Sequence, residues 1–184
     1  MISEKLKLDD IDRQIIMLIQ KDPALTHTEI AERINRSQPT VGMRIKKLEK
    51  SGILQFQPGI NFKKVDLYLA TVTLRTKNPD EMMEMAKYCP FMINAFRLSG
   101  EQNIFILLAS SKLEKLDNII NYHFRNNPII TSVTMELIID IAKDFIMPID
   151  FDSELHDPSI AKGCGEICKV QIAKAKKSIE SATQ

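Results

Sequence analysis

The chain of 184 residues carries 25 Lys and Arg residues against 24 Asp and Glu residues, which excludes a protein that is basic overall but not one with a local basic patch. No apolar run is long enough to span a membrane, and the first residues lack the apolar core of a signal peptide. Three cysteines are too few for a disulfide scaffold, so we expect a cytoplasmic protein.

The first fifty residues predict three short helices, each with its own start signal. Asp9 is placed to cap the first helix, and Thr26 with Glu29 has the pattern of a capping box for the second. Ser37 is placed to cap the third helix, whose first turn tolerates Pro39. The apolar residues of the third helix recur with helical spacing and predict a buried stripe: Val41, Ile45 and Leu48.

The other edge of the third helix is basic and can form hydrogen bonds. Residues 31–50 hold six basic and two acidic side chains, a local charge of +4. Gln, Thr and Arg on a helix that is anchored along its opposite edge can enter a DNA major groove. The alternative is a helical bundle whose basic residues are only solvated, and the tight spacing of the helices favours DNA. Gly42, inside this helix, indicates close approach of either a phosphate backbone or another helix.

The next segment predicts a small hairpin. Residues 53–56 and 60–62 are apolar and flank Pro58-Gly59, which is the pattern of two short strands around a turn. The hairpin would be the wing of a winged helix-turn-helix, so we expect a DNA-binding domain over residues 1–62.

Residues 63–150 alternate between strand and helix signals. We expect strands over 67–75, 91–98, 103–110 and 129–141, a helix that begins at Asn78, and a second helix that follows a capping box at 111–114. This order is the ferredoxin-like βαββαβ arrangement, so the chain as a whole belongs to the α+β class. Its helices cover one face of the sheet, and a second copy would cover the other, which predicts a homodimer or higher homo-oligomer.

Three segments of this chain resemble the Lrp/AsnC, or feast/famine, transcriptional regulators. They are the run Leu8–Ile16, the Thr-x-x-Glu-Ile-Ala start of the second helix, and the gapless pattern Ser37–Ile53. The resemblance implies a sequence-specific regulator that binds double-stranded DNA, and it covers roughly residues 8–150. It also implies the positions that face DNA, with Thr40 and Arg44 in direct contact: Ser37, Gln38, Thr40, Arg44 and Lys47.

The same resemblance implies a small-molecule effector site in the second domain. In that family the turn between the second and third strands reads approximately Gly-x-Tyr-Asp and helps to hold an amino acid at a subunit interface. Here the turn and its flank are Gly100, Glu101, Gln102 and Asn103, so Gln and Asn stand in the places of Tyr and Asp. A neutral Asn is a weaker partner than a carboxylate for an α-ammonium group. The other interpretation of these residues is a simple tight turn.

Residues 151–184 form an extension with a cysteine pair and a basic helical pattern. His156, Cys164 and Cys168 are three residues of the kinds that bind zinc, although zinc prefers four ligands. The cysteine pair could instead form a redox site, and the simplest alternative is that the two cysteines are small side chains that pack one face of a terminal helix.

Two other functions compete with a specific regulator. One is an enzyme, since the sirohaem decarboxylases resemble these regulators over both domains. Residues 91–97 contain no histidine that could engage a tetrapyrrole, the third helix is basic, and no catalytic constellation is visible, so we expect a non-enzyme. The other is an architectural DNA-binding protein of low specificity, whose binding would depend steeply on salt.

Overall fold

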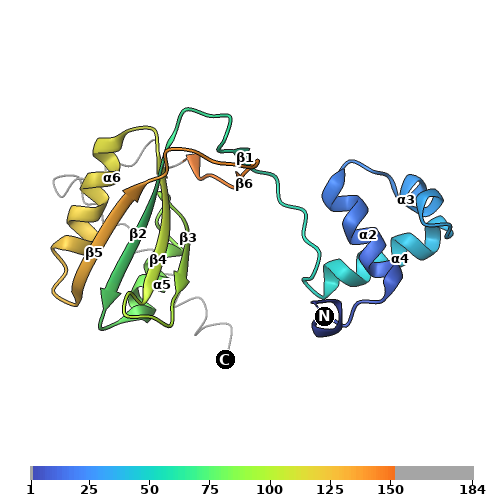
Figure 1. The fold of residues 1–184 in the computed structure, drawn as a ribbon, viewed down its shortest axis with the longest axis horizontal. Helices are drawn as coiled ribbons and strands as arrows, with labels where there is room; N and C mark the ends of the chain where they lie inside the picture. Colours follow the sequence, from blue (N-terminus) through green and yellow to red (C-terminus); the bar gives the residue numbers. More distant parts are fainter. Residues whose placement is uncertain (1, 152–184) are drawn as a thin grey trace, which may run out of the picture. The chain divides into compact units, whose positions relative to one another are not determined.

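The structure, a computed structural model, describes residues 2–151, which form two compact units divided between residues 57 and 58 (Figure 1). The first is helical and the second is built around antiparallel sheets. Among the described residues, no helix has both the length and the apolar character that crossing a bilayer requires.

The helical unit contains the three expected helices and a short one before them. The helices are α1 (Ile2–Lys5), α2 (Asp10–Lys21), α3 (His27–Arg33) and α4 (Gln38–Lys50). Asp9, Thr26 and Ser37 cap the last three as predicted, each accepting a hydrogen bond from a backbone N–H of the first turn. Their buried side chains form one apolar core: Ile15, Ile19, Ile30, Ala31, Val41, Ile45, Leu48 and Leu54.

A tight turn joins α3 to α4. Asn35 adopts a left-handed conformation with φ of 52°, which a short polar side chain tolerates better than most. The backbone N–H of Arg36 then donates to the Ala31 carbonyl over 2.9 Å, so the chain reverses within a few residues. The turn brings α4 against α3, as the helix-turn-helix spacing predicts.

The wing hairpin predicted over residues 53–62 does not form. Leu54 is only 8% exposed and its N–H bonds to the Leu48 carbonyl, so the chain after α4 completes the helical core instead of starting a strand. Strand β1 (Ile60–Asn61) pairs with β6 (Ile146–Met147), antiparallel, inside the second unit. A Cβ atom at Gly59 would lie 2.7 Å from the Met147 backbone, so this pairing requires a glycine at the entry to β1.

The second unit has the expected βαββαβ order. Its elements are β2 (Tyr68–Thr76), α5 (Pro79–Ala86), β3 (Met92–Arg97), β4 (Ile104–Ser110), α6 (Leu113–Ile120), the π-helical turn η1 (Asn121–Arg125) and β5 (Ile130–Leu137). The strands lie in the order β3-β4-β2-β5 with every neighbouring pair antiparallel, which confirms the ferredoxin-like fold. The capping box predicted at 111–114 is wrong, because the N-cap is Lys112, whose side chain makes no capping bond.

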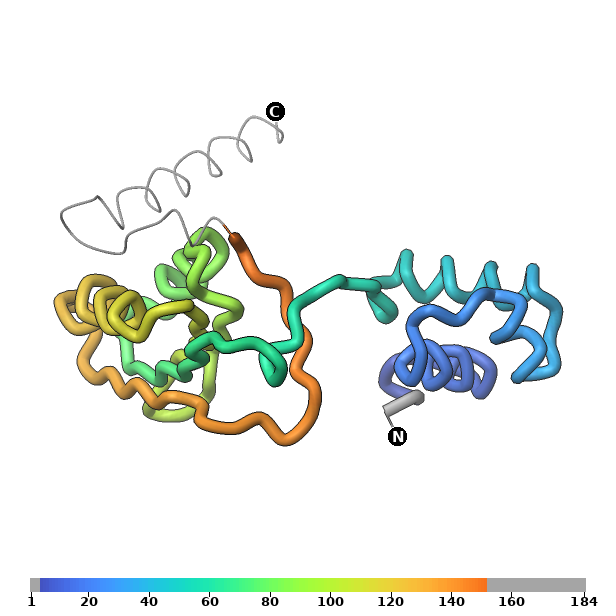
Figure 2. Tube along the Cα trace, turned by 90° about the horizontal axis from the view of Figure 1, so that it is seen from above, coloured from blue at the N-terminus to red at the C-terminus, as the bar shows by residue number. Residues whose placement is uncertain are grey.

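The two faces of this sheet differ. Helices α5 and α6 cover one face, and the segment after β5 crosses part of the other (Figure 2). The core under the helices includes Val72, Leu74, Ile106, Leu108, Leu116 and Phe124. On the second face, Phe62, Leu69, Leu107 and Ala109 are buried against side chains from residues 138–149. A face that we expected to be bare is therefore partly covered by the chain itself.

The last strand is shorter than predicted. It ends at Leu137, and after the Ile138 N–H donates to the Leu69 carbonyl over 2.8 Å the chain leaves the sheet. Leu137 is 40% exposed and Ile139 97% exposed, so they do not belong to the core as the alternating pattern predicted. Ile141 packs with the second-face cluster instead.

Candidate nucleic-acid interface

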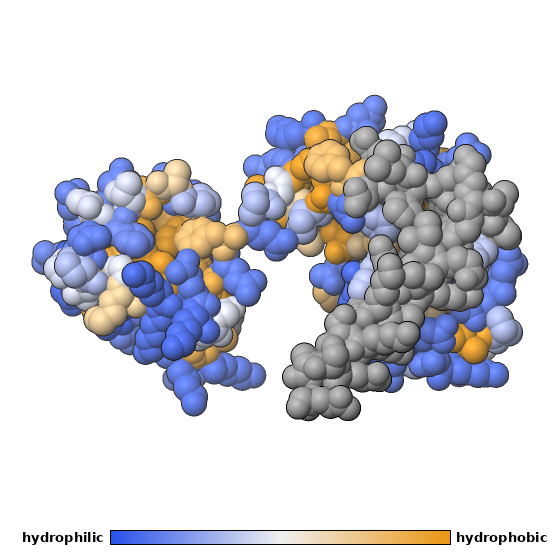
Figure 3. All heavy atoms as spheres, turned by 180° about the vertical axis from the view of Figure 1, so that it is seen from behind, coloured by the Kyte–Doolittle hydropathy of each residue, from blue (hydrophilic) through white to orange (hydrophobic). Residues whose placement is uncertain are grey.

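Helix α4 combines one deeply buried stripe with one exposed face. Val41, Ile45 and Leu48 are 0%, 4% and 3% exposed, as the helical spacing predicts. The surface of the helical unit is mostly hydrophilic in the space-filling view (Figure 3). The exposed positions of α4 opposite the stripe are two non-charged residues and three lysines: Pro39, Met43, Lys46, Lys47 and Lys50. Gln38, the first residue of the helix, is exposed beside them.

The predicted DNA-facing residues fall into three places on this helix. Gln38 and Lys47 are exposed and reach solvent. Ser37 and Thr40 belong to the N-terminal cap, where the Ser37 Oγ accepts the Thr40 N–H over 3.4 Å and lies 2.7 Å from the Thr40 hydroxyl. The fifth residue, Arg44, turns toward α2.

Arg44 forms an ion-pair bridge with the start of α2, which the sequence reasoning missed. Its Nη1 atom lies 2.6 Å from Asp9 Oδ2 and 2.8 Å from Asp12 Oδ1. The Asp12 side chain is 7% exposed and that of Arg44 24% exposed, so the bridge is partly shielded from water. The available signal was the pair of aspartates three residues apart, which also form the capping box of α2.

The bridge shifts the pKa values of Asp9 and Arg44, each in the direction that favours the charged form. The Asp12 backbone N–H, and then the Arg44 guanidinium, hold the pKa of Asp9 below its usual value. The carboxylates of Asp9 and then Asp12 raise the pKa of Arg44. Arg44 is therefore a fixed cation that ties α4 to α2.

Gly42 is explained by helix packing, one of the two alternatives that its position predicted. A Cβ atom there would lie 3.2 Å from Nδ1 of His27, the first residue of α3. The imidazole and α4 border a surface hollow of about 470 Å³, whose lining also includes Gln38, Met43 and Lys46. The α3–α4 contact thus leaves an open groove beside the exposed lysines.

The side chains of the turn predicted to bind an effector bond to the neighbouring strands β2 and β5. The Asn103 side chain accepts the Thr76 N–H over 2.9 Å and donates to the Thr76 carbonyl over 2.8 Å, so both the oxygen and the nitrogen of its amide are engaged. Glu101 pairs with Arg75 over 2.6 Å. Gln102 donates to the Ser132 hydroxyl over 3.2 Å, while its buried Oε1 atom has no hydrogen-bond partner in the described part of the chain. At Gly100 an added Cβ would meet no atom closer than 3.8 Å, so space does not demand a glycine.

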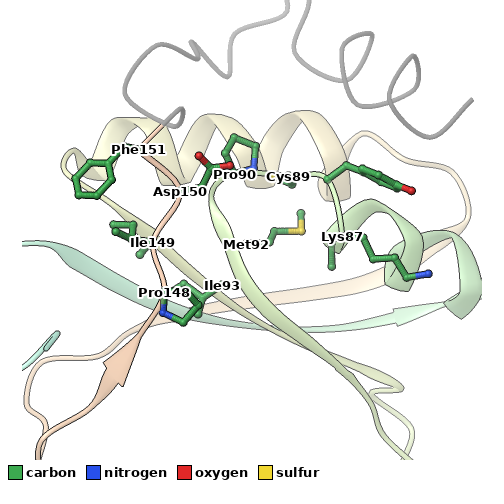
Figure 4. A pocket seen from close by; sticks show the side chains of 12 residues that line it. Lys87, Cys89, Pro90, Met92, Ile93, Pro148, Ile149, Asp150 and Phe151 are labelled. Atoms are coloured by element: carbon green, nitrogen blue, oxygen red, sulfur yellow. The ribbon is translucent and has the colours of Figure 1, made fainter. Parts of the chain in front are cut away.

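A second cavity, of about 480 Å³, lies between the start of β3 and the segment 148–151 (Figure 4). Lys87, Met92 and Ile149 are among its lining residues, and Cys89 at its edge is 5% exposed. No pattern in the sequence predicted this cavity.

The proposed zinc ligands His156, Cys164 and Cys168 lie outside the described residues, so that hypothesis stays a prediction. Within the described range, no group of three or more His, Cys, Asp or Glu side chains could hold a metal ion.

The chain is similar to DNA-binding proteins over both units. Residues 8–55 match a family model described as winged helix-turn-helix DNA-binding. An HTH-type transcriptional regulator of Pyrococcus horikoshii is 31% identical over 123 residues, which cover 64% of this chain and 77% of that protein. LrpC of Bacillus subtilis, also an HTH-type transcriptional regulator, is 26% identical over 140 residues, covering 74% and 95%.

Solved structures match the same range. The structure of B. subtilis LrpC superimposes with a TM-score of 0.63 at 26% identity, covering 74% of this chain and 97% of LrpC. Escherichia coli AsnC shares the fold, with a TM-score of 0.65 at 16% identity, over 75% of this chain and 96% of AsnC.

The capped α3–α4 pair, the lysine-bearing face of α4 and these matches define a DNA-binding transcriptional regulator. The chain belongs to the Lrp/AsnC family. The resemblance noted in the three sequence segments is thus confirmed. None of the comparisons supports the decarboxylase or the architectural interpretation.

The Asp9–Arg44–Asp12 bridge makes the stability of the helical unit sensitive to acid. Because the folded-state pKa of Asp9 lies below the usual 3.8, its contribution is present above that value and is lost as the pH falls through the folded-state pKa. We expect the unfolding free energy of this unit to fall between about pH 5 and about pH 2. Urea titration followed through the methyl signals of Ile15 and Ile45 measures it.

The variant Asp9→Asn should flatten this acid dependence, whereas Asp66→Asn in the second unit should leave it unchanged. Equal acid dependence in wild type and Asp9→Asn would show that the bridge does not carry the effect.

Proposed function

We propose that this protein is a homodimeric, sequence-specific regulator that presents α4 of each copy to one half of a two-part DNA site. The observation that carries the proposal is the orientation of α4, whose apolar stripe is buried while Lys46, Lys47 and Lys50 remain exposed. Two copies related by a two-fold axis match a site with two related halves. Since the relatives are named as transcriptional regulators, we assign no catalytic role and place the protein in the cytoplasm of a prokaryotic cell.

The exposed positions of α4 divide into base and phosphate contacts. Gln38 stands at the N-terminal end of the helix, and a glutamine amide can donate to N7 and accept from N6 of an adenine. Lys47, further along, suits a phosphate. Ser37 and Thr40 retain hydroxyl lone pairs beyond the cap and lie at the same end as Gln38. Arg44 acts indirectly, by holding α4 against α2.

The uncovered part of the sheet's second face supports the dimer. Phe96 is 46% exposed and its ring lies 5.8 Å from that of Phe105, on the neighbouring strand. The segment 138–149 covers Leu69 and Leu107, whereas Phe96 remains open to solvent. Exposed aromatic rings on an otherwise structured face indicate an interface with a partner. A second copy of the sheet offers the same apolar surface.

Footprinting on the DNA upstream of the protein's own gene tests the function. We expect a protected site with two related halves about one helical turn, or a multiple of it, apart. Replacing Lys47 by Ala should weaken binding on all sequences and reduce the dependence of log K on log salt by about one. Diffuse, salt-sensitive binding without protection would instead indicate an architectural protein.

Whether Asp12→Asn lowers or raises the affinity for DNA decides the role of Arg44. If Arg44 positions α4, Asp12→Asn loosens the bridge and weakens DNA binding, in the same direction as Arg44→Gln. Because both substitutions break the same bridge, the double variant should bind DNA no more weakly than the single variant with the lower affinity. Fluorescence anisotropy with the footprinted site measures all three affinities.

The matched control is Asp10→Asn, which also removes a negative charge from the start of α2 but leaves Arg44 paired. It should preserve or slightly strengthen DNA binding. If Asp12→Asn strengthened binding, the freed Arg44 would be a DNA contact, and the positioning role would be wrong.

We also propose that the protein binds a small-molecule effector, because the turn at residues 99–102 holds a buried acceptor atom without a partner in the described part of the chain. A buried oxygen without a partner is costly, and a ligand N–H that donates to Gln102 Oε1 would satisfy it. The structure of a Neisseria meningitidis regulator that shares the fold is a complex with L-Met (TM-score 0.66 at 18% identity, over 81% of this chain and 99% of that one). The α-ammonium group of an amino acid is one donor of this kind.

Calorimetric titration with the twenty amino acids tests the effector proposal. We expect at least one to bind, and Gln102→Met to lose that binding while Glu101→Gln, in the same turn, retains it. If no amino acid bound, or if Gln102→Met bound normally, this acceptor would not be the effector site.

A further inference from the structure

The two edges of α4 differ in charge. Along the edge of Arg44, a DNA phosphate would meet the carboxylate of Asp9, whose side chain is 52% exposed. Along the other edge lies the hollow between α3 and α4, and of the described residues that line it, only Lys46 carries a fixed charge, which is positive. A phosphate group is therefore attracted to the hollow and repelled from the opposite edge.

His27 stands in that hollow, at the first position of α3. The ring atom nearest to the Cβ position of Gly42 is Nδ1, at 3.2 Å, so Nε2 is directed away from that glycine. The side chain is half-buried. Neither the His27 nor the Lys46 side chain makes a hydrogen bond or ion pair with the rest of the described chain, so both retain donors for a ligand.

We propose that His27, in its protonated form, and Lys46 bind one phosphate group of the DNA backbone. In a helix-turn-helix the second helix lies in the major groove while the helix before it crosses the backbone. Here these helices are α4 and α3, so the start of α3 meets the sugar-phosphate strand that borders the groove. The inference rests on the DNA-binding function and adds a contact that the sequence resemblance did not include.

The groups around His27 make its protonation depend on the DNA. Glu29 on the same helix is occupied by the cap, accepting the Thr26 N–H over 2.8 Å and the Thr26 hydroxyl over 2.7 Å. Lys46, on α4, is the charged side chain that lines the same hollow. A phosphate bound between His27 and Lys46 favours the charged imidazole, so DNA binding takes up a proton. Histidine is the side chain that ordinarily changes its charge between about pH 5 and about pH 8.

This contact reads no bases. Phosphate contacts position a protein on the duplex and contribute to affinity on every sequence. The pH dependence is therefore measurable on a duplex of mixed sequence, without knowledge of the operator. We expect affinity for such a duplex to rise severalfold from about pH 8 to about pH 6, and the slope of log K against log salt to steepen by about one.

The experiment measures anisotropy of a labelled mixed-sequence duplex with the full-length protein, over a series of salt concentrations at both pH values. His27→Gln should bind as the wild type does at the higher pH and lose the steepening at the lower pH. Lys46→Gln should lose about one unit of slope at both values. Lys77→Gln, which removes an exposed lysine charge from the second unit, is the matched control and should behave as the wild type.

The outcomes separate this inference from the DNA-binding function. If the wild type bound with the same salt slope at both pH values, or if His27→Gln kept the steepening, the His27 contact would be overturned while DNA binding stood. If the wild type did not bind the duplex at either pH, both would be overturned. Circular dichroism of His27→Gln checks its fold, and equal wild-type slopes at the two pH values would overturn the contact even if that variant did not fold.

Discussion

The orientation of α4 depends on the bridge that Arg44 makes to Asp9 and Asp12. An apolar stripe alone lets a short helix roll over its neighbours, because the hydrophobic effect has no preferred direction. An ion pair with defined hydrogen-bond geometry fixes the rotation. Asp12 is almost completely buried, and leaving a buried carboxylate without its cation is costly. The direction in which the exposed lysines point therefore follows from a contact on the other side of the helix.

The same bridge determines which charged residues of α4 are available to DNA. It neutralises the one arginine of α4 and places carboxylates along one edge of the helix. The positive charge available to DNA is then concentrated on the lysines and in the hollow beside His27. A local charge of +4 over residues 31–50 says that cations are present, but the pairing decides which of them can meet a phosphate.

Most local signals and the order of the strands were predicted correctly, whereas side-chain contacts between distant parts of the chain were missed. The caps at Asp9, Thr26 and Ser37 are local signals, as is the spacing of Val41, Ile45 and Leu48, and all were predicted correctly. Arg44 was predicted to contact DNA, which stays a prediction, but no local pattern reveals that it also pairs with Asp12, 32 residues away. In the effector turn, the sequence does not reveal that the Asn103 side chain makes hydrogen bonds to the backbone of Thr76, 27 residues earlier.

The wing shows the same limit. Pro58-Gly59 has the composition of a hairpin turn, yet a glycine is required there because the Met147 backbone lies against it. β1 pairs with β6 within the second unit, while Leu54 is buried in the core of the first. Because the partner strand of β1 comes much later in the chain, no local pattern in residues 53–62 distinguishes this pairing from a hairpin.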